Sequence, residues 1–178
     1  MKTENTIMYD NWIYENTSDN RARFILGEKG ENTLVCVGIN PSTAIPDHLD
    51  NTLKQVKRMS KTFGYDSWIM INIYPQIATN PNDLHTDIEK ELHLQNLEHI
   101  KLLLKNKMPD IWAAWGSLIL KRYYLLDCLK EIYQLSNNKN WYSAGKLTED
   151  IHPRHPLYNG GIKLEKFDMK KYLKSLCK

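Results

Sequence analysis

Short apolar runs that end at a turn residue recur along the chain. Polar residues hardly interrupt these runs, and a loop signal follows each one, which is typical of strands buried on both faces of a parallel sheet. Three runs are clear and the fourth is shorter: Thr33–Gly38, Trp68–Asn72, Ile111–Trp115 and Trp141–Ser143. We therefore predict four buried strands.

The segments between these runs show helical spacing, with apolar residues every three to four positions. This pattern predicts helices over residues 49–63, 84–104, 118–135 and 164–176. Alternating strands and helices favour right-handed crossovers and helices on both faces of the sheet. The expected fold is therefore α/β, a three-layer αβα arrangement with a central, mostly parallel four-stranded sheet. The segment before Glu31 predicts an antiparallel hairpin or edge strand, in a position that the pattern does not fix.

The length of 178 residues suits one domain, and no repeat or low-complexity tract divides it. We therefore treat residues 1–178 as a single unit. With 42% hydrophobic and 25% charged residues the chain resembles ordinary globular proteins, and no apolar run is long enough to span a bilayer. The polar stretch at residues 1–11 lacks the apolar core of a signal peptide. Three widely spaced cysteines, Cys36, Cys128 and Cys177, favour a reducing cytoplasm.

The net charge of +3 is too small to indicate a nucleic-acid partner. Basic residues are nevertheless enriched late in the chain, where residues 139–178 carry nine basic and four acidic side chains. Two interpretations remain open for five lysines in and directly before the last predicted helix: a phosphate-binding surface, or an ordinary solvated face. These lysines are Lys163, Lys166, Lys170, Lys171 and Lys174.

Candidate chemistry lies in the loops that follow the predicted strands. In open α/β sheets, ligands bind where the carboxyl ends of the strands meet loops. These loops begin at Gly38, Asn72, Trp115 and Ser143. In the first loop Asn40 precedes a proline, which restricts its backbone and fixes the direction of its side chain. Taken alone, an Asn-Pro pair more often only punctuates a turn.

Four motifs lie in or next to these loops: Gly38-Ile-Asn-Pro41, Ile69-Met-Ile-Asn72, Trp115-Gly-Ser117 and His155-Pro-Leu157. In this order they resemble the motifs of the uracil-DNA glycosylase superfamily. The first is similar to the mismatch-specific branch, in which Asn replaces the Asp of the uracil-specific branch. The resemblance implies a fold like that of the glycosylases.

A second, narrower set of features is Asn40-Pro-Ser-Thr-Ala44, Asp50 with Thr52, the Trp115-Gly116 pair, and Pro153-Arg-His-Pro-Leu-Tyr158. These features resemble the domain of unknown function called DUF1643, found in bacterial and phage proteins. The resemblance covers about residues 9 to 175.

The superfamily resemblance implies a monofunctional DNA glycosylase that flips and hydrolytically excises uracil or a related, including 5-substituted, pyrimidine. Cutting an N-glycosidic bond builds positive charge on the sugar and negative charge on the base. The resemblance places His155 as a donor to O2 of the base and Asn40 beside the attacking water. Because an amide cannot accept the proton of that water, we expect slow chemistry.

Base-binding residues follow from the same resemblance. Asn72 would donate and accept at the O4 and N3–H edge of the base; its alternative role is a strand-end Asn that caps a turn. Ser42 stands where the strict uracil enzymes have a tyrosine that rejects the thymine methyl group, and Ile39 belongs to the same motif. The aromatic residue that would stack on the base is open between Tyr74 and Tyr158.

DNA-binding residues are implied by the two later motifs. Gly116 and Ser117 would bind a phosphate, or Ser117 would only cap a helix. Arg154 would pair with a phosphate or with a surface carboxylate. Leu157, next to Pro156, would fill the gap left in the base stack, or would only pack within its loop.

Two assignments stay open at this point. His152 and His155 both precede proline, so the late motif aligns in two ways; we prefer His155 because Pro-Leu-Tyr follows it. Asp50 would either activate water in compensation for Asn40 or interact as a charge with the start of a helix.

No metal-binding, nucleotide-binding or serine-hydrolase motif is present, and we expect neither a metal nor a cofactor. The expected partner is DNA, single- or double-stranded and uracil-containing; an acidic, DNA-mimicking inhibitor protein is a further candidate. We expect a monomer that does not contact a membrane. Two other functions remain open: a catalytically weak or inactive module that binds DNA or a nucleotide, and an enzyme acting on free nucleosides, nucleotides or RNA.

Overall fold

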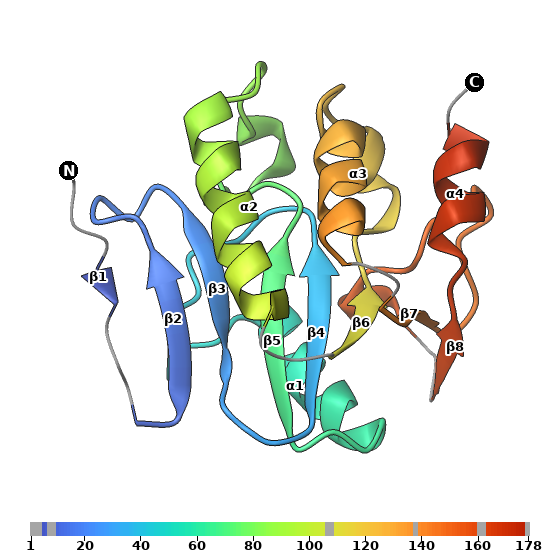
Figure 1. The fold of residues 1–178 in the computed structure, drawn as a ribbon, viewed down its shortest axis with the longest axis horizontal. Helices are drawn as coiled ribbons and strands as arrows, with labels where there is room; N and C mark the ends of the chain where they lie inside the picture. Colours follow the sequence, from blue (N-terminus) through green and yellow to red (C-terminus); the bar gives the residue numbers. More distant parts are fainter. Residues whose placement is uncertain (1–4, 7–9, 106–108, 137–138, 160–162, 177–178) are drawn as a thin grey trace.

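The computed structural model describes residues 5–6, 10–105, 109–136, 139–159 and 163–176, which form one mixed sheet with helices on both faces (Figure 1). The strands are β1 (Asn5–Thr6), β2 (Trp12–Asn16), β3 (Arg23–Glu28), β4 (Thr33–Gly38), β5 (Ser67–Asn72), β6 (Asp110–Ala113), β7 (Trp141–Ala144) and β8 (Leu164–Lys166). The α-helices are α1 (Asn51–Thr62), α2 (Lys90–Lys105), α3 (Leu125–Leu135) and α4 (Met169–Leu176). Short 3₁₀ helices are η1 (Pro81–Asp83), η2 (Gly116–Leu120) and η3 (Pro156–Tyr158).

The centre of the sheet consists of the four strands that the apolar runs predict. They lie in the order β5-β4-β6-β7 and are parallel, with Val35 opposite Ile69 on one side and Ile111 on the other. The sheet is wider than the prediction, because β3, β2 and β1 extend it antiparallel beyond β5, and β8 extends it antiparallel beyond β7. The whole sheet is therefore mixed and only partly parallel.

Three predicted helix boundaries are corrected by the structure. Residues 164–166, predicted as the start of the last helix, form β8, since they pair with the otherwise open edge of β7. Residues 84–89 precede α2, and the backbone carbonyl oxygens of Leu84 and His85 accept hydrogen bonds from the side chain of Arg122. The predicted helix over 118–135 is divided into η2 and α3.

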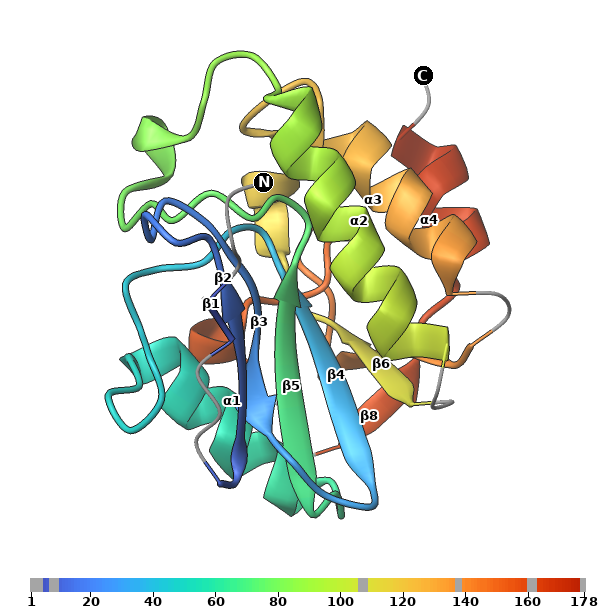
Figure 2. The ribbon, with the colours of Figure 1, turned by 60° about the vertical axis from the view of Figure 1, so that its left-hand side comes forward.

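Alternate residues of the central strands separate two layers of helices. Leu34 and Cys36 of β4 pack with Leu53 and the rest of the apolar face of α1. Val35 and Val37 face the other way. They pack in the cluster that holds the buried residues of α2, α3 and α4 (Figures 1 and 2). The three-layer αβα arrangement that the sequence predicts is therefore present.

The loops that follow β4 and β5 lead to opposite faces of the sheet. The chain passes from β4 to α1 on one face, and from β5 to α2 on the other. Such a reversal opens a crevice at the carboxyl ends of the strands, where α/β proteins bind ligands. Within the described ranges, no helix is both long and apolar enough to cross a membrane.

Candidate functional site

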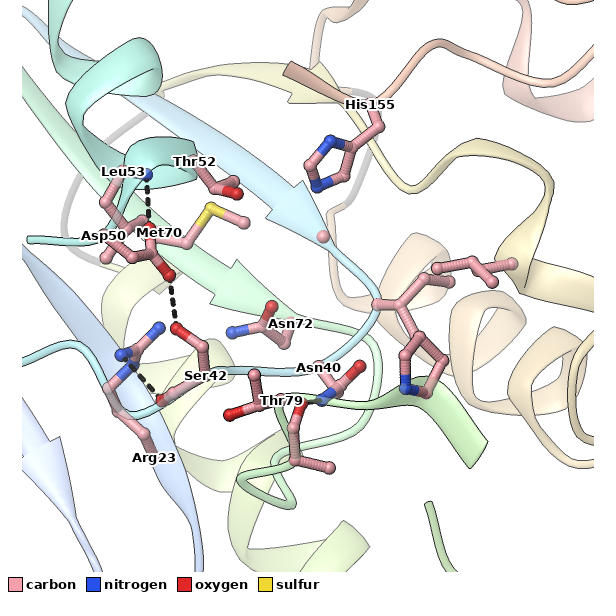
Figure 3. Close-up of a pocket in the computed structure, with 15 residues that line it drawn as sticks. Arg23, Asn40, Ser42, Asp50, Thr52, Leu53, Met70, Asn72, Thr79 and His155 are labelled. Carbon is pink, nitrogen blue, oxygen red and sulfur yellow. Dashed lines mark hydrogen bonds between the residues drawn. The ribbon is translucent and has the colours of Figure 1, made fainter. Parts of the chain in front are cut away.

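A cavity of about 160 Å³ occupies this crevice at the carboxyl ends of β4 and β5 (Figure 3). Its size is below the range of pockets for drug-sized ligands, roughly 300–1,000 Å³, and suits a group as small as one heterocyclic ring. The polar side chains that line it are Arg23, Asn40, Ser42, Asp50, Thr52, Asn72, Thr79 and His155. The cavity therefore brings together polar residues from four separate parts of the chain.

Asn72 presents an unused amide to the cavity. The residue is the last of β5, its exposed fraction is 1%, and neither Oδ1 nor Nδ2 has a hydrogen-bond partner. Gly38 leaves room for it, because a Cβ atom at that position would lie 3.0 Å from Oδ1 of Asn72. A buried donor and acceptor left unpaired are unfavourable by about 1–3 kcal/mol each. The arrangement suits a ligand that offers an acceptor and a donor side by side.

Asn40 is fixed in orientation by its own amide nitrogen. Nδ2 donates to the backbone oxygens of Ala78 at 2.8 Å and Pro41 at 3.1 Å, with a longer contact of 3.4 Å to Gln76. These bonds attach the loop after β5 to the loop after β4. They leave Oδ1 as the polar atom of Asn40 that is available to accept a hydrogen bond from a ligand or water.

Asp50 caps a helix and lines the cavity at the same time. It is the N-cap of α1, where Oδ1 accepts from the backbone N–H of Leu53 at 2.8 Å. Oδ2 accepts a hydrogen bond from the hydroxyl of Ser42. Asp50 also contributes the one carboxylate among the residues that line the cavity.

His155 lines the cavity as a neutral hydrogen-bond donor. Its Nδ1 accepts from the backbone N–H of Leu157 at 3.3 Å, which leaves the proton of the neutral ring on Nε2. Burial lowers the pKa of His155 below its ordinary value, and the charge of Asp50 only partly opposes this shift. Gly116, with φ of +65°, lies against it: a Cβ atom there would be 3.6 Å from the Cβ of His155. The N–H of Gly116 also donates to the backbone oxygen of Pro153 at 2.8 Å, which holds the two loops together.

His152 lies outside the cavity, in the core. Its exposed fraction is 1%, and its Nδ1 forms a 2.8 Å hydrogen bond with the hydroxyl of Tyr172. Its backbone N–H donates to Oγ1 of Thr148. Of the two His-Pro pairs, the structure therefore places the second at the cavity.

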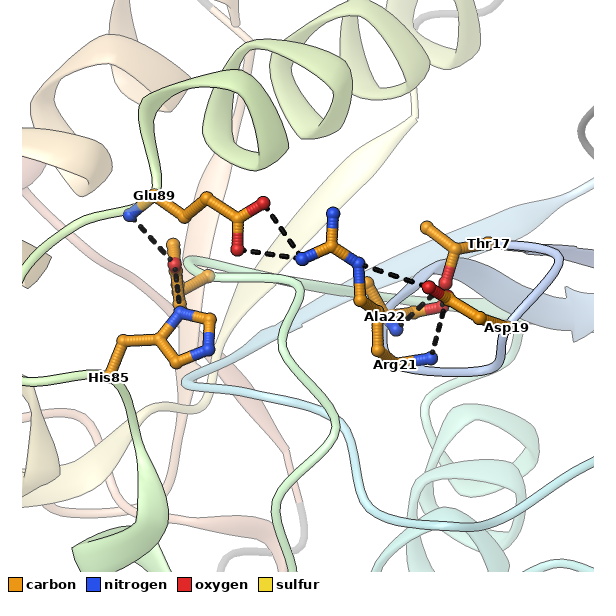
Figure 4. A network of polar contacts seen from close by, with 7 residues as sticks. Thr17, Asp19, Arg21, Ala22, His85 and Glu89 are labelled. Atoms are coloured by element: carbon orange, nitrogen blue, oxygen red, sulfur yellow. Dashed lines mark hydrogen bonds and ion pairs between the residues drawn. The ribbon is translucent and has the colours of Figure 1, made fainter. Parts of the chain in front are cut away.

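Tyr74 and Tyr158, the two candidates for stacking on a base, do not line the cavity. Tyr74 is fully buried; its hydroxyl bonds Nδ1 of His85 at 2.8 Å and accepts from the N–H of Glu89 at 3.1 Å. The carboxylate of Glu89 continues this network to Arg21 (Figure 4). Tyr158 is largely exposed and lies beside the ring of His155. Ile39, by contrast, is a lining residue.

The predicted DNA-binding residues lie in η2, in η3 and between them in the chain. Ser117 is exposed in η2, whose N-cap, Trp115, makes no side-chain capping bond. Nε of Arg154 donates to the backbone oxygen of Lys146 at 2.8 Å. In η3, Pro156 is buried, whereas Leu157 is 46% exposed.

Several lining residues are not predicted from the sequence, chiefly Arg23, Met70, Thr79 and Leu118. Arg23 is the first residue of β3, and because β3 runs antiparallel to β5 it starts at the edge where β5 ends. Nη1 donates to the backbone oxygens of Ala44 at 2.6 Å and Ser42 at 3.3 Å. The only signal in the sequence is a cation directly before the apolar run of residues 24–26.

The DUF1643 family model, described as a protein of unknown function, matches residues 23–157. This span is narrower than the resemblance over residues 9 to 175 suggests. It includes β3, all four parallel strands and every residue that lines the cavity. No curated protein and no solved structure matches the chain. Because the matched span exceeds half of its length, the chain belongs to the DUF1643 family.

Proposed function

We propose that the protein is a DNA glycosylase that flips uracil or a related pyrimidine, including 5-substituted ones, into this cavity and hydrolyses its glycosidic bond. The observation that carries the proposal is the unpaired, buried amide of Asn72 in a cavity of one-ring size. The order of the loop motifs and their resemblance to uracil-DNA glycosylases support the same proposal.

The free edge of uracil complements this amide. O4 of the base accepts and N3–H donates, whereas Asn72 offers Nδ2–H and Oδ1. Bases that enter such pockets are read through hydrogen bonds to this edge. In this pose the base provides a hydrogen-bond partner for both unpaired side-chain atoms of Asn72.

The chemical step would use His155 and Asn40. The Nε2–H of His155 stabilises the negative charge that develops at O2 of the leaving base; losing one such donor typically lowers the rate about 10²–10³-fold. Asn40 positions water through Oδ1 but cannot take its proton. Asp50 supplies the one carboxylate among the lining residues, whose negative charge opposes the positive charge that develops on the sugar.

The DNA strand would lie over η2 and η3. Leu157 fills the gap in the base stack, and Leu118, which is partly exposed and lines the cavity, lies beside the entering base. Ser117 and Arg154 are candidates to bind phosphates. An acidic protein that mimics DNA would compete for the same surface.

A strand-cleavage assay tests the proposal. Oligonucleotides, single- and double-stranded, carry uracil, a mismatched thymine or 5-hydroxymethyluracil, and alkali breaks the abasic sites that result. Wild type is compared with Asn40→Ala, His155→Ala and the control Arg21→Gln, which removes an exposed side chain outside the cavity. We expect cleavage by wild type and the control and its loss in the other two variants. Equal cleavage by all four proteins would contradict the assigned roles.

The second candidate function is a module that binds DNA or a nucleotide without cutting it. One observation favours it: both oxygens of Asp50 already accept hydrogen bonds, and the other candidate for activating water, Asn40, is an amide. DNA binding that depends on Asn72, in the absence of any cleavage, would select this second function.

A further inference from the structure

Arg23 is a buried cation that the glycosidic reaction as described does not use. Its exposed fraction is 2%, it lines the cavity, and its Nε is buried without a hydrogen-bond partner. Among the described residues, no carboxylate lies close enough to form an ion pair with it. Its bonds to Ser42 and Ala44 use Nη1 and leave Nε unsatisfied.

Such a side chain is unfavourable unless another group provides it with a partner. Burial lowers the pKa of Arg23 to about 10, and Asp50 is the chief charge that opposes this shift. A buried charge or donor without a partner destabilises a protein unless a bound group provides the missing contact. The unused donor therefore points to an acceptor atom on the ligand.

The order of residues around the cavity indicates which part of a pyrimidine meets Arg23. Figure 3 shows His155 at one end, Asn72 in the middle, and Ser42 with Arg23 at the other end. A ring with O2 at His155 and its N3–H and O4 edge at Asn72 directs its 5-position toward Ser42 and Arg23. Ser42 is small, which leaves space for a substituent on that atom.

We propose that the cavity selects pyrimidines whose 5-substituent carries a neutral oxygen acceptor, such as a hydroxymethyl or formyl group, and that Arg23 recognises this oxygen. The inference rests on the proposed function and names the substrate class of the same site. A carboxylate substituent is less suitable, because the negative charge of Asp50 lies beside the same end of the cavity.

The test compares two pairs of pyrimidines of matched size. Duplexes carry 5-formyluracil or 5-vinyluracil, and 5-hydroxymethyluracil or 5-ethyluracil, on a 2′-fluoro sugar that resists cleavage. Fluorescence anisotropy gives the Kd of each. We expect each oxygen-bearing member to bind wild type about tenfold or more tightly than its hydrocarbon partner, the factor typical of a hydrogen bond to a charged group.

A variant assigns the preference to Arg23. Arg23→Met removes every donor, so we expect each pair to bind alike; Arg21→Gln, the exposed control, keeps the wild-type ratio. A thermal melt checks that Arg23→Met is folded. The Kd ratios measured on wild type test the substrate class even if this variant fails to fold.

The outcomes separate the two proposals. Equal Kd values within both pairs on wild type would overturn the substrate class, while binding and cleavage of uracil would leave the glycosylase proposal standing. A preference that persists in folded Arg23→Met would overturn the role of Arg23. Failure to bind any of the pyrimidine probes would overturn the proposed function and this inference together.

Discussion

Asn96 of α2 donates a hydrogen bond from Nδ2 to the backbone oxygen of Asn72, at 3.0 Å. Both asparagines are buried, but only Asn72 lines the cavity. The helix behind the sheet thus fixes the backbone of the residue whose side chain faces the cavity. Under the proposed function, Asn96 is a positioning residue.

Replacing Asn96 should therefore affect both stability and binding. Asn96→Ala leaves a buried carbonyl unpaired, and we expect the free energy of unfolding to fall by about 1–3 kcal/mol. Binding of uracil-containing DNA should weaken although no group that contacts the base is removed. Urea unfolding and anisotropy measure the two effects. Glu98→Ala, an exposed change on the same helix, is the control and should alter neither; full-strength binding by Asn96→Ala would contradict the positioning role.

Asn72→Ala should separate function from stability. The change removes two buried atoms that have no partners, so we expect the free energy of unfolding to stay within about 0.5 kcal/mol of wild type or to rise. Base-dependent DNA binding should weaken by about tenfold or more. A large loss of stability would show instead that the amide has a structural partner.

Asp50 is tested by a pair of substitutions. Asp50→Asn keeps an oxygen that can cap α1 and should unfold like wild type, whereas Asp50→Ala should lose about 0.5–2 kcal/mol of stability. Excision should slow in both variants, since both remove the negative charge from the cavity. Wild-type excision by Asp50→Asn would restrict Asp50 to its capping role.

The two histidines of the late motif predict a pH dependence of stability. Burial lowers the pKa of both His152 and His155 below the ordinary value of 6.5. The unfolded chain therefore binds more protons than the folded one as pH falls through this window. Stability should be complete above about pH 6.5 and should decrease as pH falls toward the folded pKa values.

Urea unfolding between about pH 7.5 and pH 5.5 measures this effect, with carboxyl groups still largely ionised. Of the two titrating histidines, only His152 lies outside the cavity. His152→Gln removes this group and should flatten the pH dependence of stability. An unchanged slope in this variant would show that His152 does not contribute.

Leu157→Ala should distinguish duplex from single-stranded substrates. The side chain is largely exposed, so stability should change by less than about 0.5 kcal/mol. Excision from duplex DNA should fall more than excision from single strands, because only the duplex requires a residue to fill the base stack. The control is Leu94→Ala on the exposed face of α2, which should behave as wild type. Equal effects on the two substrates would favour action on single-stranded or free nucleotides.

The sequence alone determined the centre of the fold. Uninterrupted apolar runs can be buried on both faces only in the middle of a sheet, so β4, β5, β6 and β7 were predictable, as were the layers of helices. The loops at their ends were equally predictable as the place of a candidate site, because parallel strands direct their carboxyl ends to one edge. Asn40, Ser42, Asn72 and His155 all lie there.

Tertiary structure alone decided which residues complete the cavity and which candidate residues lie outside it. Local pattern could not show that β3 joins the sheet antiparallel and delivers Arg23 to the same edge, or that β8 replaces the start of a helix. It favoured His155 over His152 through the residues that follow, but it could not show that the ring of His152 bonds Tyr172 in the core while His155 lines the cavity. These outcomes depend on pairing between segments that are distant in the chain. Each residue is buried or hydrogen-bonded by residues far from it in the sequence, so the pattern of its neighbours in the chain cannot predict the result.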